Sequence, residues 1–158
     1  MHSNLPRRRC LQAGLVLGSA FWLPAARACE YYTANLRVTH PWTRASQAGA
    51  TSAVVCMKFD EVRRADRLVL VESPIASGAE MGGVGGIGVP AHRAAAISGV
   101  DFFVPEGQET HLLENGTFVR LTGLKFPLEA GRSYPLRLGF ELGGAFDATL
   151  TVDYTRFT

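Results

Sequence analysis

The sequence is poor in side chains that carry nucleophilic, redox or metal chemistry. It has three cysteines, three methionines and four histidines in 158 residues. The Gly-x-Ser-x-Gly turn of serine hydrolases is absent, and no two histidines have the His-Glu-x-x-His spacing of zinc hydrolases. The acidic residues are scattered over turn-like segments and form no obvious facing pair. The sequence therefore predicts a protein that is not an enzyme.

A surplus of basic charge is also missing once the N-terminal segment is set aside. The whole chain has a formal net charge of +2. Four arginines precede residue 29, whereas all 14 acidic residues follow it, so residues 29–158 contain 12 basic and 14 acidic residues and carry a net charge of −2. This balance favours neither nucleic-acid binding nor a polybasic membrane arm.

Residues 1–28 have the pattern of an export signal. A basic start (Arg7, Arg8, Arg9) precedes an apolar run that is too short to span a bilayer, and Ala26-Arg27-Ala28 offers a cleavage site. The arginines resemble a twin-arginine signal, and a Sec signal is the alternative. We therefore expect export to the periplasm, cleavage near Ala28 and no membrane span in the remaining chain. A lipoprotein modified at Cys29 is a further alternative, which Arg27 fits poorly.

An exported protein folds where disulfides are stable. Cys10 would be removed with the signal, which leaves Cys29 and Cys56. A disulfide between these two cysteines is one prediction. The alternatives are that both are thiolate ligands of a soft metal ion, or that Cys56 is a small hydrophobic residue inside a strand.

Short segments of alternating apolar and polar residues, separated by Gly and Pro turns, follow the signal. The predicted strands cover residues 36–40, 51–59, 66–71, 97–104, 110–113, 118–122, 136–140 and 148–154. Such a pattern is typical of one all-β domain over residues 29–158, an antiparallel two-sheet sandwich. Residues 83–88 satisfy Gly-x-Gly-x-x-Gly, but no amphipathic helix follows, so we expect a loop and not a dinucleotide site.

Several short motifs in this domain resemble the periplasmic PCu(A)C copper chaperones. They are Trp-x-Arg-Ala at residues 42–45, Asp-x-Leu-Val at 66–69, Val-Pro-x-Gly at 104–107, and Gly-x-x-x-x-Leu-x-Gly-Leu-Lys-x-Pro-Leu-x-x-Gly at 116–131. The resemblance extends from Leu36 to Val152. It implies a Greek-key sandwich of the cupredoxin-like or immunoglobulin-like kind.

The same resemblance implies a copper site, but its ligands are missing. The family's first His corresponds to Gly82, and its His-x-Met pair corresponds to Phe118 and Arg120. Cu(I) needs two or three soft or imidazole donors, and a protonated guanidinium cannot bind a metal ion. The remaining candidate donors are Met81, Cys29, Cys56, His111 and His92. We also considered His40, although a histidine next to a proline at a strand end is typical of a surface residue.

Two hypotheses follow. The first is a periplasmic copper-handling protein with a rebuilt site, which binds Cu(I) and delivers it to a cuproenzyme such as an oxidase, or to another copper carrier. The second is an accessory protein that binds no metal and contacts a protein partner through Phe118 and Arg120. Aromatic and arginine side chains commonly dominate the binding energy of such contacts.

Overall fold

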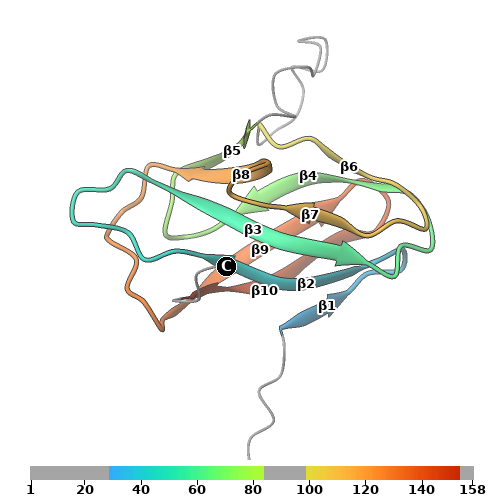
Figure 1. Ribbon diagram of the computed structural model, residues 1–158, viewed down its shortest axis with the longest axis horizontal. Coiled ribbons are helices and arrows are strands. Elements are labelled where there is room, and N and C mark those ends of the chain that lie inside the picture. The colour runs from blue at the N-terminus through green and yellow to red at the C-terminus, as the bar shows by residue number, and fades with distance from the viewer. Residues whose placement is uncertain (1–28, 84–98, 154–158) are drawn as a thin grey trace, which may run out of the picture.

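The computed structural model describes residues 29–83 and 99–153, and within them the chain forms ten strands and no helix (Figure 1). The strands are β1 (Glu30–Tyr32), β2 (Arg37–Thr43), β3 (Ser52–Asp60), β4 (Asp66–Glu72), β5 (Gly78–Gly83), β6 (Phe102–Val104), β7 (Thr110–Leu112), β8 (Thr117–Thr122), β9 (Ser133–Phe140) and β10 (Gly144–Val152). In the described part of the chain no helix is long and apolar enough to cross a membrane.

Hydrogen bonds join the strands in the order β5-β8-β3-β2-β10-β9-β4-β6, with β1 added to β2 and β7 added to β3. The long strand β3 belongs to both layers of the sandwich. Its first half, from Ser52 to Val55, pairs with β8, and its second half pairs with β2 and β7. In Figure 1, β5 and β8 therefore lie above, and β2 and β10 lie below. The predicted all-β sandwich is confirmed.

One pair of strands departs from the antiparallel arrangement. The first long strand, β2, runs parallel to the last, β10, with Trp42 opposite Thr151 and Thr43 opposite Val152. All other pairs are antiparallel. Segments from the two ends of the domain thus lie side by side, which brings residues near position 40 close to residues near position 150.

Strand β2 continues through Pro41, although the sequence predicted that Pro41 would end it. Its pairing with β3 shifts register between Thr39 and Trp42, and His40 has a positive φ of 49°. A bulge lets the strand pass a residue that has no N–H to donate, and it also turns a side chain in a new direction. The short strand β1, which no alternation of apolar residues marks, was not predicted.

The core follows the predicted alternation. On β8 the side chains of Val119 and Leu121 are fully buried, whereas Phe118, Arg120 and Thr122 are partly exposed. Phe59 lies between the rings of Phe102 and Phe140, with centroid distances of 5.7 and 6.0 Å. Among residues 29–83 and 99–153, 23 buried hydrophobic residues from both layers form the core, so burial of apolar surface is the main force that closes the sandwich.

The buried carboxylate of Asp66 links two turns through hydrogen bonds. Asp66, 3 % exposed, accepts hydrogen bonds from Nδ2 of Asn35 and from the backbone N–H groups of Arg67, Leu142 and Gly143, at 2.8 to 2.9 Å. Burial opposes ionisation of this carboxyl, but the four hydrogen bonds outweigh it and lower its pKa below the usual value. Asp66 thereby holds the turn before β2 against the turn between β9 and β10.

Candidate functional site

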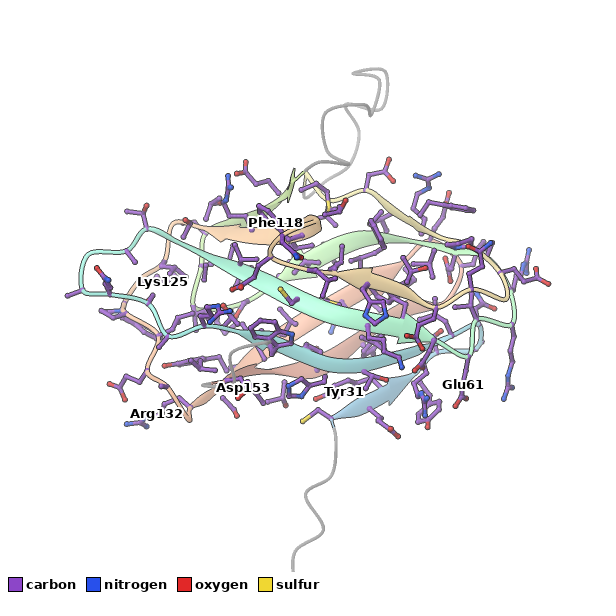
Figure 2. All side chains as sticks on the ribbon, in the orientation of Figure 1. Tyr31, Glu61, Phe118, Lys125, Arg132 and Asp153 are labelled. Carbon is purple, nitrogen blue, oxygen red and sulfur yellow. The ribbon has the colours of Figure 1, made fainter. Side chains whose placement is uncertain are left out.

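Strands β5 and β8 bring together the positions at which the resemblance implies copper ligands. Gly82 lies directly opposite Phe118, and Glu80 lies directly opposite Arg120. Because side chains alternate along a strand, these four residues share one face of the β5–β8 ribbon, which we call the outer face. Phe118 is labelled on this upper part of the molecule in Figure 2.

The ring of Phe118 fills the space above Gly82. A Cβ atom added at Gly82 would lie 2.8 Å from Cζ of Phe118 and closer still to Cε2. Real Cβ atoms are not found at such distances, so any larger side chain at Gly82 would have to displace the ring. An imidazole at position 82 would therefore require the Phe118 ring to move.

A charged pair completes the outer face. The guanidinium of Arg120 lies 5.3 Å from the centroid of the Phe118 ring, and its Nη1 forms an ion pair with Oε1 of Glu80 at 3.2 Å. A cation–π contact and an ion pair hold the arginine where the resemblance implies a metal ion. Its positive charge opposes the binding of a cation there.

Met81 lies on the other face of the same ribbon. It is opposite Val119, which is fully buried, and its side chain packs against the core. Met81, which the sequence analysis named as a candidate donor, thus points inward. A thioether on the inner face cannot converge with the residues of the outer face, because successive side chains of a strand point to opposite sides.

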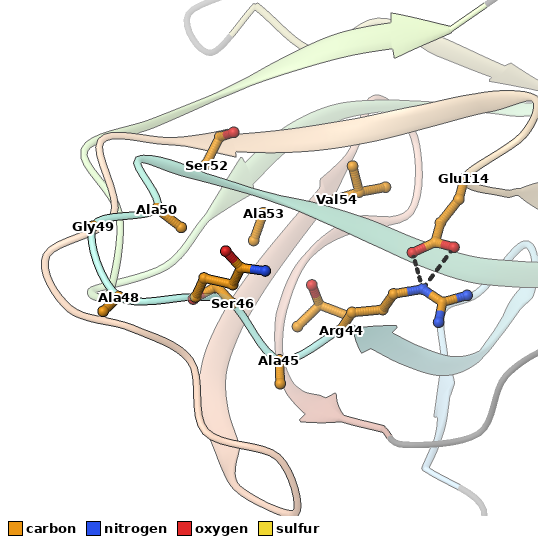
Figure 3. Close-up of a pocket in the computed structure, with 12 residues that line it drawn as sticks. Arg44, Ala45, Ser46, Ala48, Gly49, Ala50, Ser52, Ala53, Val54 and Glu114 are labelled. Atoms are coloured by element: carbon orange, nitrogen blue, oxygen red, sulfur yellow. Dashed lines mark hydrogen bonds and ion pairs between the residues drawn. The ribbon is translucent and has the colours of Figure 1, made fainter.

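Cys56 is buried close to Arg44 and Glu114, two residues that line a surface hollow of about 530 Å³ (Figure 3). Nε of Arg44 donates to both oxygens of Glu114 at 2.6 and 2.8 Å, and the guanidinium lies 5.9 Å from the ring of Trp42. Burial, and then the negative charge of Glu114, raise the pKa of Cys56 to about 12. Because the thiolate is the metal-binding form, this cysteine is a poor ligand at neutral pH.

The two described cysteines are free thiols, and the predicted disulfide is not formed. Cys29 lies opposite His40 on one side of β2, where its carbonyl accepts the His40 N–H at 2.7 Å, whereas Cys56 lies opposite Trp42 on the other side. Two strand spacings amount to about 10 Å. A disulfide requires Cα atoms within about 7 Å.

The remaining predicted donors do not join these residues. Nε2 of His111 lies 2.8 Å from Oε1 of Glu109, whose other oxygen binds Nζ of Lys58, so His111 belongs to a charged surface cluster on β3 and β7. His92 lies outside the described residues. Among residues 29–83 and 99–153, no group of three or more His, Cys, Asp or Glu side chains could hold a metal ion.

The fold creates one pair of side chains, His40 and Asp153, that no pattern in the sequence predicted. Nε2 of His40 lies 3.3 Å from Oδ2 of Asp153, which follows β10. The two residues are 113 positions apart, and only the parallel pairing of β2 with β10 brings them together. Cys29 is the backbone partner of the same histidine.

The fold and the arrangement of its strands define the class: the protein is a PCuAC-type β-sandwich. Similar solved structures include the apo PCuAC domain from PmoF1, with 26% identity and a TM-score of 0.66 over 80% of this chain and 99% of that one. The copper-bound PCuAC domain from PmoF2 has 22% identity and a TM-score of 0.64 over 80% and 98%. CuI-DR1885 from Deinococcus radiodurans has 19% identity and a TM-score of 0.56 over 82% and 83%.

The comparison with curated proteins gave no match. The sequence profile of the lipoprotein LpqE-like family matches residues 36–152. The chain therefore belongs to the LpqE-like family.

Proposed function

We propose that this protein is a copper-handling protein of the PCuAC type. It acts after export to the periplasm, binds Cu(I) and passes it by ligand exchange to a cuproenzyme or another copper carrier, and its role is that of a carrier and not of a catalyst. The likeness of the whole sandwich to PCuAC domains supports this proposal, since two of the similar structures are described as bound to copper.

The outer face of β5 and β8 is not where this chain would hold the ion. Gly82 offers no side chain, Phe118 offers no electron pair, and Arg120 adds a positive charge that is neutralised by Glu80. Glu80 is the one oxygen donor among these four residues, and Cu(I) prefers sulfur and imidazole donors to carboxylates. A Cu(I) site in this protein therefore needs donors from elsewhere in the fold.

The outer face itself favours a second function, that of an accessory protein which binds a protein partner there. Phe118 and Arg120 stack on each other in a partly exposed position, and an aromatic ring next to an arginine is a common centre of protein interfaces. This function requires no metal ion and would be compatible with the first.

A competition titration of Cu(I) against a chromophoric chelator, with the exported protein freed of metal, tests the first function. The expected result is tight binding of one ion per chain. Absence of binding above that of an unrelated exported protein would exclude the carrier role.

The second function is tested by placing a photoreactive residue at position 120 in cells that export the protein. A crosslink to one defined protein is expected from position 120. Arg132, an exposed residue whose side chain forms an ion pair with its neighbour Glu129, is the matched control position. Equal crosslinking from both positions would exclude a specific contact through the outer face.

A further inference from the structure

Cys29 and His40 meet where β1 joins β2. The β1–β2 ladder pairs Glu30 with Thr39, and the hydrogen bond from His40 N to Cys29 O, 2.7 Å long, continues it by one residue. Side chains of directly opposed residues have Cβ atoms about 5 Å apart. Cys29 and His40 are therefore neighbours across this ladder, with a thiol on one strand and an imidazole on the next.

Both side chains lie near β10. Cys29 alternates with Glu30 and therefore has the same direction as Tyr31, whose ring stacks on Phe146 of β10 and whose hydroxyl accepts the Thr149 N–H at 2.7 Å. His40 is turned toward Asp153, at the end of β10. Tyr31 and Asp153 are both labelled on the lower part of the molecule in Figure 2.

The backbone of His40 is in an unusual conformation. Its φ of 49° lies in the left-handed region, which is uncommon for residues other than glycine, asparagine and aspartate. This conformation belongs to the bulge before Trp42, and bulges redirect side chains near functional sites. Here the redirected side chain is an imidazole that is 40 % exposed, so that an ion from solvent can reach it.

Asp153 determines which ring nitrogen of His40 is available to bind a metal ion. Nε2 faces Oδ2 of Asp153 at 3.3 Å, and Nδ1 has no hydrogen-bond partner among the residues that the structure describes. A carboxylate beside one ring nitrogen favours the tautomer that carries its proton there, and the other nitrogen then presents its electron pair. This is the arrangement by which carboxylates orient metal-binding histidines.

We propose that Cys29 Sγ and His40 Nδ1 form a two-donor Cu(I) site at the junction of β1, β2 and β10, with Asp153 as its positioning residue. Thiolate and imidazole are both suitable Cu(I) donors. On binding, the thiol of Cys29 releases its proton to solvent and the neutral imidazole loses none. The thiolate cancels the charge of Cu(I), and the Asp153 carboxylate favours the cation from nearby.

This inference rests on the proposed copper-handling function and gives it a location. The site lies on β1, β2 and β10, not on the β5–β8 ribbon that the resemblance implies. Its two donors are partly exposed, as exchange with a second carrier requires, whereas Cys56 is fully buried.

The test is a Cu(I) competition titration of the exported chain and its variants, with bicinchoninate as the competing chelator. Cys29→Ser and His40→Asn should each lower the affinity by more than about 100-fold, because each removes one of two ligands. Asparagine tolerates the backbone conformation of residue 40, so the fold is preserved. Cys56→Ala and His111→Asn are the matched controls and should leave the affinity unchanged.

Asp153→Asn should weaken Cu(I) binding by about 10- to 100-fold. Nitrogen NMR of the His40 ring in the metal-free protein supplies an independent measurement. We expect a proton on Nε2 in the parent protein and a mixture of tautomers in the variant, a change that a merely structural role of Asp153 would not produce.

The results separate the two proposals. If the parent protein binds Cu(I) and neither Cys29→Ser nor His40→Asn weakens it, the two-donor site is wrong and the carrier function stands. If the parent protein binds no Cu(I), both proposals fail. Mass spectrometry of the exported protein is a further check, since a lipid on the Cys29 sulfur would block the site and overturn it.

Discussion

The outer face of β5–β8 and the junction of β1, β2 and β10 differ in whether their side chains are available to bind a ligand. On the outer face, a ring covers a glycine and an arginine is neutralised by a glutamate, so every group has a partner within the ribbon. At the junction, a thiol and an imidazole nitrogen face solvent beside a carboxylate. Side-chain identity at a few aligned positions, and not the strand arrangement, decides which region can take a ligand.

The comparison also explains how a scaffold can persist while its site changes. Trp42, Leu121 and Leu128, which belong to the motifs of the resemblance, are buried and hold the layers together. Gly82, Phe118 and Arg120 lie on the outer face, where substitution need not disturb the core. Packing motifs therefore identify the fold, but they do not establish the chemistry of the site.

The largest contrast should appear in thiol reactivity. Cys29 is partly exposed, whereas Cys56 is fully buried and its pKa is raised to about 12. At pH 8 such a pKa leaves roughly one thiolate in 10⁴ molecules. A maleimide should therefore modify Cys29 at least ~10³-fold faster than Cys56, as measured by mass spectrometry of peptides. Similar rates for both cysteines would contradict the conclusion that Cys29 is accessible and Cys56 is buried with a raised pKa.

Removing the Asp66 carboxylate should destabilise the sandwich as a whole. Asp66→Ala leaves four donors without an acceptor, and each buried unpaired donor costs about 1 to 3 kcal/mol. We expect the free energy of unfolding in urea to fall by about 3 kcal/mol or more. A loss below ~1 kcal/mol would show that the two turns hold each other by other contacts.

The Asp66 carboxyl should also make the free energy of unfolding decrease in acid. Because the pKa of Asp66 is lower in the folded state than in the unfolded state, its contribution to stability is complete above the unfolded value of about 4. That contribution is lost as the pH falls from there through the folded pKa. The pKa of Asp60, lowered mainly by the hydrogen bond from Arg37, acts in the same direction. Urea unfolding between pH 7 and pH 3 measures this loss, and Asp66→Asn should reduce it.

The close contact between Gly82 and the Phe118 ring can be tested by adding a methyl group at position 82. Gly82→Ala should destabilise the protein by about 1 to 3 kcal/mol, because the new Cβ meets the Phe118 ring. In a Phe118→Ala background the same change should cost little, which a double-mutant cycle measures. Gly116→Ala is the control, since its Cβ would have no neighbour closer than 3.9 Å. An equal cost with and without the ring would contradict the close contact.

The smallest effect is expected at Arg120. Its ion pair with Glu80 is exposed, with 42% and 51% of the two side chains accessible, and such pairs add little to stability. Arg120→Met should leave the urea midpoint nearly unchanged. It should also create no Cu(I) site, because Phe118 and Gly82 still lack donors; a gain of tight binding would contradict this account.

Alternation and turn residues were sufficient to predict the class of fold and the inner and outer residues of β8. The resemblance, and not the alternation, singled out Gly82, Phe118 and Arg120, and the register of β5 and β8 brings these residues together. The bulge at His40 and the contact of His40 with Asp153 could not be predicted. The positive φ belongs to a bulge in β2, and the contact joins residues 113 positions apart that the pairing of β10 with β2 brings together. No local pattern in the sequence encodes either feature.

The most direct measurement is anomalous scattering at the copper edge from crystals of the Cu(I)-loaded protein. Our account predicts one peak between Sγ of Cys29 and Nδ1 of His40, beside Asp153, and none on the outer face of β5–β8. A peak next to Phe118 and Arg120, or beside Met81, would contradict it.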